Sequence, residues 1–69
     1  MTMDNRIVKA ARLVKLILES GRVSVRRASV ETGLPRRTVY RYVKNLSEVY
    51  DIRVDRGFIV IDIQPSNLP

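Results

Sequence analysis

Arginine and lysine side chains gather in the middle of the chain, in a pattern that suits an anionic partner. The stretch from Arg22 to Lys44 contains seven basic residues and only one acid, Glu31. The whole chain carries a formal net charge of +6, with 13 basic and 7 acidic residues. Most of the basic residues are arginines, whose planar guanidinium groups bind phosphates and guanine edges through two hydrogen bonds at once. The sequence therefore predicts a nucleic acid as the partner.

Two helices separated by a tight turn would hold these charges in place. Ser24 can cap a helix over about residues 25–32, and Gly33 can end it in the left-handed conformation. Pro35 fits the first turn of a second helix, over about residues 35–49, because its missing N–H has no intrahelical partner to lose. Four apolar side chains would face inward or fill the angle between these helices: Val25, Ala28, Leu34 and, as a further candidate, Val30. A basic second helix after such a turn is typical of helix-turn-helix proteins that bind the DNA major groove.

The second helix is divided into an apolar side and a basic, aromatic side. An apolar stripe recurs at helical spacing, formed by Val39, Val43, Leu46 and Tyr50. The opposite side carries Arg37, Tyr40, Arg41 and Lys44. Tyr42 falls between the two sides, and we expect it to pack against the C-terminal hairpin. A basic side is often no more than a solvated surface, so the charges alone do not decide the function.

The polarity of this helix favours the functional interpretation. Arg36 and Arg37 stand at its N-terminus, whereas Glu48 and Asp51 stand near its C-terminus. Both placements oppose the helix dipole, at a typical cost of about 0.3–1 kcal/mol each. Near a phosphate backbone the arginines and the dipole would attract the same anion, and the opposition would disappear.

Four residues of the second helix are the candidates for reading DNA bases. Arg37 and Arg41, one turn apart, are the best placed for base edges, with guanine as the expected target. Arg36 and Tyr40 can reach either bases or phosphates.

Other polar residues are candidates for phosphate contacts, which fix the position of a protein on DNA without reading sequence. Lys44 and Thr38 belong to this group, although the Thr38 hydroxyl has an equally good alternative role within its own helix. Arg26 and Arg27 open the helix over residues 25–32, which would cross the DNA backbone.

The C-terminal third changes to a strand pattern. Residues 52–63 are rich in β-branched side chains around Arg56-Gly57, which predicts a hairpin. Arg53 and Arg56 lie on this hairpin, and Arg56 at its tip is a candidate for the adjacent minor groove. Residues 64–69 are expected to form a flexible tail.

The N-terminal third predicts one more helix, over about residues 4–19, with Thr2 or Asp4 as its N-cap and Gly21 as its stop. One apolar stripe consists of Ile7, Ala11, Val14 and Leu18, and it is widened by Leu13, Leu16 and Ile17. A stripe this wide indicates either a helix deep in a three-helix core or a surface for self-association. A homodimer, formed through this helix, is the expected assembly.

The order of elements then defines the fold class: mainly α with a small β-hairpin, a three-helix winged helix-turn-helix over residues 1–63. Residues 22–24 would add a very short strand before the second helix.

Two segments resemble the DNA-binding domains of bacterial and archaeal winged-helix regulators: Val23-Ser24-Val25 and the run from Thr32 to Leu46. The stretch TGLPRRTVYR resembles IclR-type repressors, RRTVYRYVKNL also resembles DeoR-type regulators, and Arg56-Gly-Phe-Ile-Val is similar to their glycine-aromatic wing. The resemblance implies that residues 35–49 enter the major groove, with Arg37, Thr38, Tyr40 and Arg41 facing DNA. Members of those families carry an effector domain after the wing, so this chain would be an excised domain or a stand-alone regulator of the kind common among archaea and their viruses.

Composition argues against several other classes. The chain has no cysteine and no histidine, which excludes disulfides and the usual zinc sites. We expect no enzyme, since the acids are scattered and no glycine-rich phosphate loop occurs. No cofactor, small-molecule ligand or membrane span is expected, and a cytoplasmic location follows. Two alternatives to a sequence-specific transcription regulator remain: a non-specific architectural or replication-associated DNA binder, and a winged-helix module for protein interaction.

Overall fold

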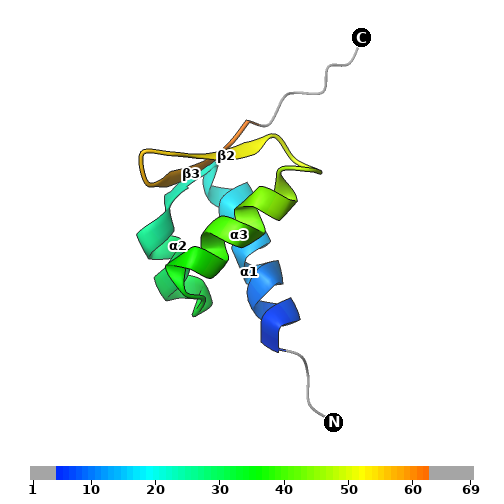
Figure 1. Ribbon diagram of the computed structural model, residues 1–69, viewed down its shortest axis with the longest axis vertical. Coiled ribbons are helices and arrows are strands. Elements are labelled where there is room, and N and C mark those ends of the chain that lie inside the picture. Colours follow the sequence, from blue (N-terminus) through cyan, green and yellow to red (C-terminus); the bar gives the residue numbers. More distant parts are fainter. Residues whose placement is uncertain (1–4, 63–69) are drawn as a thin grey trace.

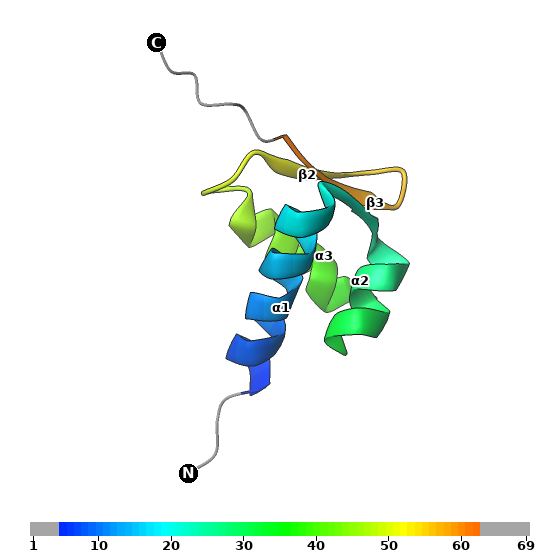
Figure 2. The same cartoon turned by 180° about the vertical axis from the view of Figure 1, so that it is seen from behind.

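The computed structural model describes residues 5–62, which fold into three helices and a small antiparallel sheet (Figure 1). The elements follow one another as α1 (Asn5–Ser20), β1 (Arg22–Ser24), α2 (Val25–Thr32), α3 (Arg36–Leu46), β2 (Ile52–Asp55) and β3 (Phe58–Ile61). The helices lie against one face of the sheet, and α3 crosses α1 (Figures 1 and 2). The fold class is therefore confirmed: mainly helical, with a hairpin compatible with a winged-helix layout.

The sheet has three strands, in the order β1-β3-β2. Val23 of β1 lies opposite Ile59 of β3, and Val54 of β2 lies opposite Ile59 on the other side. The hairpin is thus extended by the short strand that precedes α2. Since side chains alternate along a strand, Val23 and Ile59 turn toward the helices while the exposed Arg53 turns away.

A single hydrophobic core joins the sheet to all three helices. Its most deeply buried side chains are Leu13 and Ile17 of α1, Ala28 of α2, Val39 of α3 and Ile59 of β3. The expected inward residues Val25 and Leu34 are buried as well. Val30, the further candidate, is 75% exposed and was wrongly expected in the interior.

The helix over 35–49 is shorter than the sequence indicated, since α3 runs only over Arg36–Leu46. Pro35 stands one position before the first turn, as the N-cap residue with φ −61° and ψ 151°. At the other end, the Ser47 hydroxyl donates to the Lys44 carbonyl, which offers the backbone an alternative to continued helix. The chain then turns so that Ile52 can enter the core.

The apolar stripe of the first helix is not the face that enters the core. Leu13 and Ile17 are buried, whereas Ile7 is 68% and Leu18 is 40% exposed. The buried residues, Leu13 and Ile17, are among those that widen the stripe. The expected N-caps Thr2 and Asp4, together with Ile63 and the tail over 64–69, lie outside the described residues.

Candidate nucleic-acid interface

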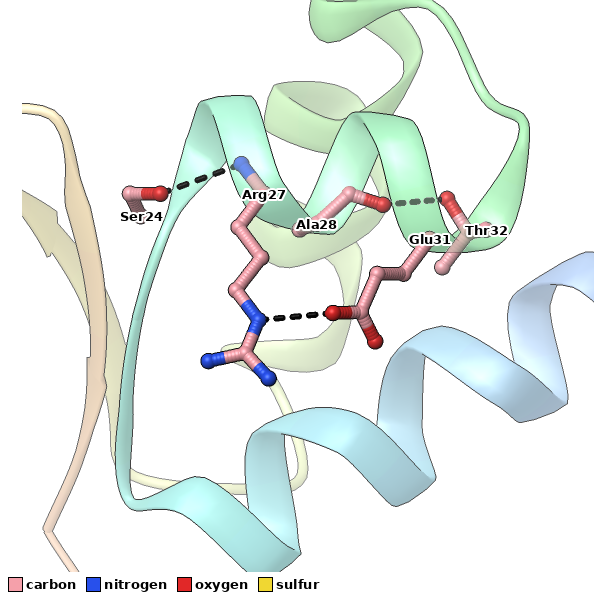
Figure 3. Close-up of polar contacts among 5 residues, drawn as sticks. All are labelled: Ser24, Arg27, Ala28, Glu31 and Thr32. Carbon is pink, nitrogen blue, oxygen red and sulfur yellow. Dashed lines mark hydrogen bonds and ion pairs between the residues drawn. The ribbon is translucent and has the colours of Figure 1, made fainter.

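α2 is fixed at both ends by hydrogen bonds that its sequence predicts. The Ser24 hydroxyl accepts a hydrogen bond from the Arg27 amide at 3.0 Å (Figure 3), which confirms the expected N-cap. At the C-terminus Gly33 has φ 77°, and its amide donates to the Ser29 carbonyl at 2.9 Å. Both ends of α2, the helix that precedes α3 in the chain, are therefore held by hydrogen bonds.

The turn between the helices is held by a buried hydroxyl group. The Thr32 hydroxyl donates to the Ala28 carbonyl at 2.6 Å (Figure 3) and accepts from the Leu34 amide at 3.3 Å. The Ser29 hydroxyl donates to the Leu34 carbonyl. With its backbone held on both sides, Leu34 is buried in the angle between α2 and α3. These contacts set the angle at which α3 leaves the turn.

The outer face of α3 carries the predicted base-reading residues together. Arg37 and Arg41 are exposed on adjacent turns, with Lys44 one turn further along. An open depression of about 460 Å³ lies between them, lined by Pro35, Arg37, Thr38 and Arg41. Arg36 and Tyr40 are also exposed, at one flank of this face. All six predicted residues of this helix thus lie on α3, and only Thr38 is half-buried.

The first turn of α3 combines positive side chains with backbone amides at a helix N-terminus. The Thr38 amide donates to the Pro35 carbonyl at 2.9 Å, which leaves the amides of Arg36 and Arg37 to face a ligand. Pro35 provides no side-chain cap, and the first turn contains no acid. Helix N-termini leave amides without intrahelical partners, and here Arg36 and Arg37 accompany them. Both features attract anions. The start of α3 is therefore electrostatically suited to a phosphate group.

The two arginines of α2 differ in their contacts. Arg27 donates from Nε to Glu31 Oε2 at 2.7 Å, one turn along the same helix (Figure 3). Arg26 is exposed. A phosphate would have to share the Arg27 guanidinium with Glu31, so Arg26 is the stronger candidate for a phosphate contact at this end.

The hairpin tip lies beside the start of α2. The Gly57 carbonyl accepts a hydrogen bond from the Val25 amide at 2.9 Å. The turn holds Arg56 at φ 53° and Gly57 at φ 80°, and left-handed backbone is unfavourable for a side chain such as that of arginine. Because the neighbouring residues Val25 and Gly57 are hydrogen-bonded, Arg26 and Arg56 lie at the same edge of the molecule. Arg53 is instead on the face of the sheet turned away from the helices.

Three side chains have surroundings that the sequence analysis missed. Arg22 of β1 stacks over the Phe58 ring, with its guanidinium carbon 4.4 Å from the ring centre, so this charge is partly used in packing. Asn45 is exposed one turn beyond Arg41, and it lines an apolar groove between α3 and α1. Tyr42 is half-buried against the core and also lines this groove, together with Ala10 of α1. Its expected contact with the hairpin stays a prediction.

No protein-family model, curated protein or solved structure matches this chain. The resemblance to winged-helix regulators therefore stays a prediction, and the functional argument depends on the site itself. Among residues 5–62, no helix is both long and apolar enough to cross a membrane.

Proposed function

We propose that this protein is a sequence-specific, double-stranded DNA-binding transcription regulator. The observation that carries the proposal is the division of α3: Val39 and Val43 hold one side in the core, while Arg37, Arg41 and Lys44 stand exposed on the other. A helix presented in this way fits the major groove of B-DNA, which is about 12 Å wide. On this proposal the protein would associate with the DNA of the cytoplasm.

Direct readout would come from the middle of α3. Arg37 and Arg41 lie one turn apart, about 6 Å along the helix axis, and each can donate two hydrogen bonds to a guanine. Tyr40 flanks these arginines and is a further candidate for base contact. Such pairs typically contribute about 1–3 kcal/mol each to discrimination against the wrong base.

Phosphate contacts would hold α3 in register. The amides at the start of α3, together with Arg36, would bind one phosphate, and Lys44 another. Arg26 and the Arg56 tip would grip the backbone or minor groove at the edge where α2 begins. The hydrogen bond from the Val25 amide to the Gly57 carbonyl joins the hairpin tip to the start of α2. The contacts made by Arg56 and by Arg26 would therefore keep a fixed spacing.

The proposal is tested by presenting the pure protein with a pool of randomised duplexes at fixed, moderate salt and sequencing the bound fraction. A short enriched motif containing guanine is the expected result. Binding without enrichment, with a steep salt dependence, would favour a non-specific architectural binder. Absence of binding even at low salt would contradict DNA binding and leave a protein-interaction module as the better account.

A further inference from the structure

An apolar stripe on α1 is left outside the core. Ile7 is 68% and Leu18 is 40% exposed, Ala11 is exposed, and Val14 is half-buried between them. The N-terminal turns of α1 extend past the other helices (Figures 1 and 2). Charged residues could have occupied these positions without cost to the core, so the stripe calls for an apolar partner.

The stripe continues into a groove between α1 and the C-terminal end of α3, which lie side by side in Figure 2. One hollow of about 190 Å³ is lined by Ala10, Val14, Tyr42 and Leu46, among others. A second hollow adjoins it, because Val14 and Leu46 also line this one together with Leu18 and Tyr50. The groove and the stripe thus form one apolar surface on the side of α1 next to α3.

The spacing of the stripe suits pairing with itself. Ile7, Ala11, Val14 and Leu18 are separated by 4, 3 and 4 residues, and this series is the same in either direction. If a second α1 ran antiparallel, Ile7 would face the partner's Leu18 and Ala11 would face the partner's Val14. Alternating steps of three and four are the spacing at which paired helices interlock their apolar side chains.

The charges favour the antiparallel arrangement over the parallel one. The first three turns of α1 contain only basic charged residues among those described, Arg6, Lys9, Arg12 and Lys15, while Glu19 stands near the other end. Glu48 and Asp51 follow α3 close to that same end, where Tyr50 borders Leu18. Antiparallel pairing places the basic half of each helix beside the acidic end of its partner, whereas parallel pairing would align like charges.

We propose that a second copy of this chain covers this surface, through antiparallel pairing of the two α1 helices. The consequence for DNA binding rests on the proposed function. On α3 the groove is lined by Tyr42, Asn45 and Leu46, and none of Arg37, Arg41 and Lys44 lines it. The pairing would leave both basic faces open, and a twofold dimer would read an inverted repeat. Burial in a dimer would also add to the small core of a 69-residue chain.

The first test compares two matched substitutions by sedimentation at a series of protein concentrations. Ile7→Glu places a charge in the pairing surface, and Val30→Glu places the same charge on α2, where Val30 is 75% exposed. We expect the native chain and Val30→Glu to be dimers, and the dissociation constant of Ile7→Glu to rise by roughly 100-fold or more. Circular dichroism should show native helix content in both variants. A monomeric native chain, or an Ile7→Glu dimer, would overturn the proposal.

The second test fixes the direction of pairing. The chain has no cysteine, so single-cysteine variants Ile7→Cys and Leu18→Cys, one of them carrying a mass label, can be mixed and oxidised. Antiparallel pairing predicts mixed disulfides, whereas parallel pairing would give disulfides within each variant alone. The two positions are about 16 Å apart on one helix, too far for a disulfide within a chain.

Failure of this proposal is distinguishable from failure of DNA binding. On a duplex with a single half-site, Ile7→Glu should retain the affinity of a native monomer, while on the inverted repeat its affinity should fall. A native chain that dimerises but binds no duplex would uphold the pairing and contradict the proposed function. Recovery of a single, unpaired half-site from the randomised pool, with a monomeric native chain, would do the reverse.

Discussion

The two helices of the helix-turn-helix differ in how their ends are satisfied. α2 has a side-chain cap from Ser24, a left-handed Gly33 at its end, and an ion pair between Arg27 and Glu31. α3 begins at Pro35 without a side-chain cap, and its first turn contains two arginines and no acid. Both helices start with basic residues, but only α2 compensates for them within its own sequence.

This difference suggests different roles for the two helices: α2 positions the turn, and on the proposed function α3 contacts DNA. The hydrogen bonds and the ion pair of α2 join residues of this same chain. These polar groups therefore mainly fix the position of the turn. The charges of α3 are left open on a helix whose other side is anchored by Val39 and Val43. A helix whose polar groups already have partners would be stabilised little by DNA. At the N-terminus of α3, by contrast, a phosphate would interact favourably with the helix dipole and the two arginines. The comparison predicts that substitutions of the capping and turn residues of α2 change stability. Substitutions of Arg26 and of the outer side of α3 should instead change binding.

The largest effect on binding is expected for Arg41→Ala and Arg37→Ala. Each removes a base contact on the proposed face, and the affinity for the selected duplex should fall by about 1–3 kcal/mol, roughly 5- to 150-fold. Discrimination at one base position should relax at the same time. Fluorescence anisotropy with matched and mismatched duplexes measures both.

Arg12→Ala is the matched control. It removes the same charge as the α3 substitutions, but from an exposed position on α1. On a duplex with a single half-site, where pairing of α1 does not contribute, it should alter affinity only slightly, through the general field of the protein. Equal losses for Arg12→Ala and Arg41→Ala would mean that net charge, and not the face of α3, governs binding.

Two threonines allow the comparison to be tested with one kind of change. Thr32 on α2 is buried, and its hydroxyl bonds both Ala28 and Leu34. Thr32→Val would leave the Leu34 amide without that partner, at an expected cost of about 1–3 kcal/mol in the free energy of unfolding. Denaturant titration gives this value directly.

Thr38→Val on α3 should behave in the opposite way. Thr38 borders the depression between Arg37 and Arg41, where we assign it a phosphate contact. Its loss should reduce DNA affinity by about tenfold, roughly 1.4 kcal/mol, with little change in the unfolding midpoint. If Thr38→Val destabilised the fold as much as Thr32→Val, Thr38 would be a structural hydroxyl, the alternative that its sequence position also allowed.

The local features of α2 were predictable because short-range rules determine them. Ser24 is followed at the right distance by a helix, Gly33 alone can end it without strain, and Leu34 is the apolar residue that remains for the angle. The Arg27–Glu31 ion pair also has a local signal, the spacing of four residues, which the sequence analysis did not use.

Features that depend on distant packing could not be obtained in this way. The apolar residues of α1 cover so much of its circumference that the sequence does not tell which side meets the core. The pairing of β1 with β3 joins Val23 to Ile59, far apart in the chain, and it made the hairpin a three-stranded sheet. The early end of α3 combines a local cause, the hydrogen bond from Ser47 to Lys44, with the distant requirement that Ile52 enters the core.

The smallest expected effect separates stability from function most clearly, because its two parts have opposite signs. Arg36→Glu places an acid in the first turn of α3, where it would interact favourably with the helix dipole. The free energy of unfolding should rise by roughly 0.3–1 kcal/mol at low ionic strength, and this gain should shrink as salt is added. DNA affinity should fall, because a negative charge would then stand where a phosphate is expected. Arg36→Gln, which removes the charge without reversing it, should lie between the native chain and Arg36→Glu in both measurements. A variant that lost stability and affinity together would mean that Arg36 supports the fold, and the contrast between a self-satisfied α2 and an open α3 would no longer hold.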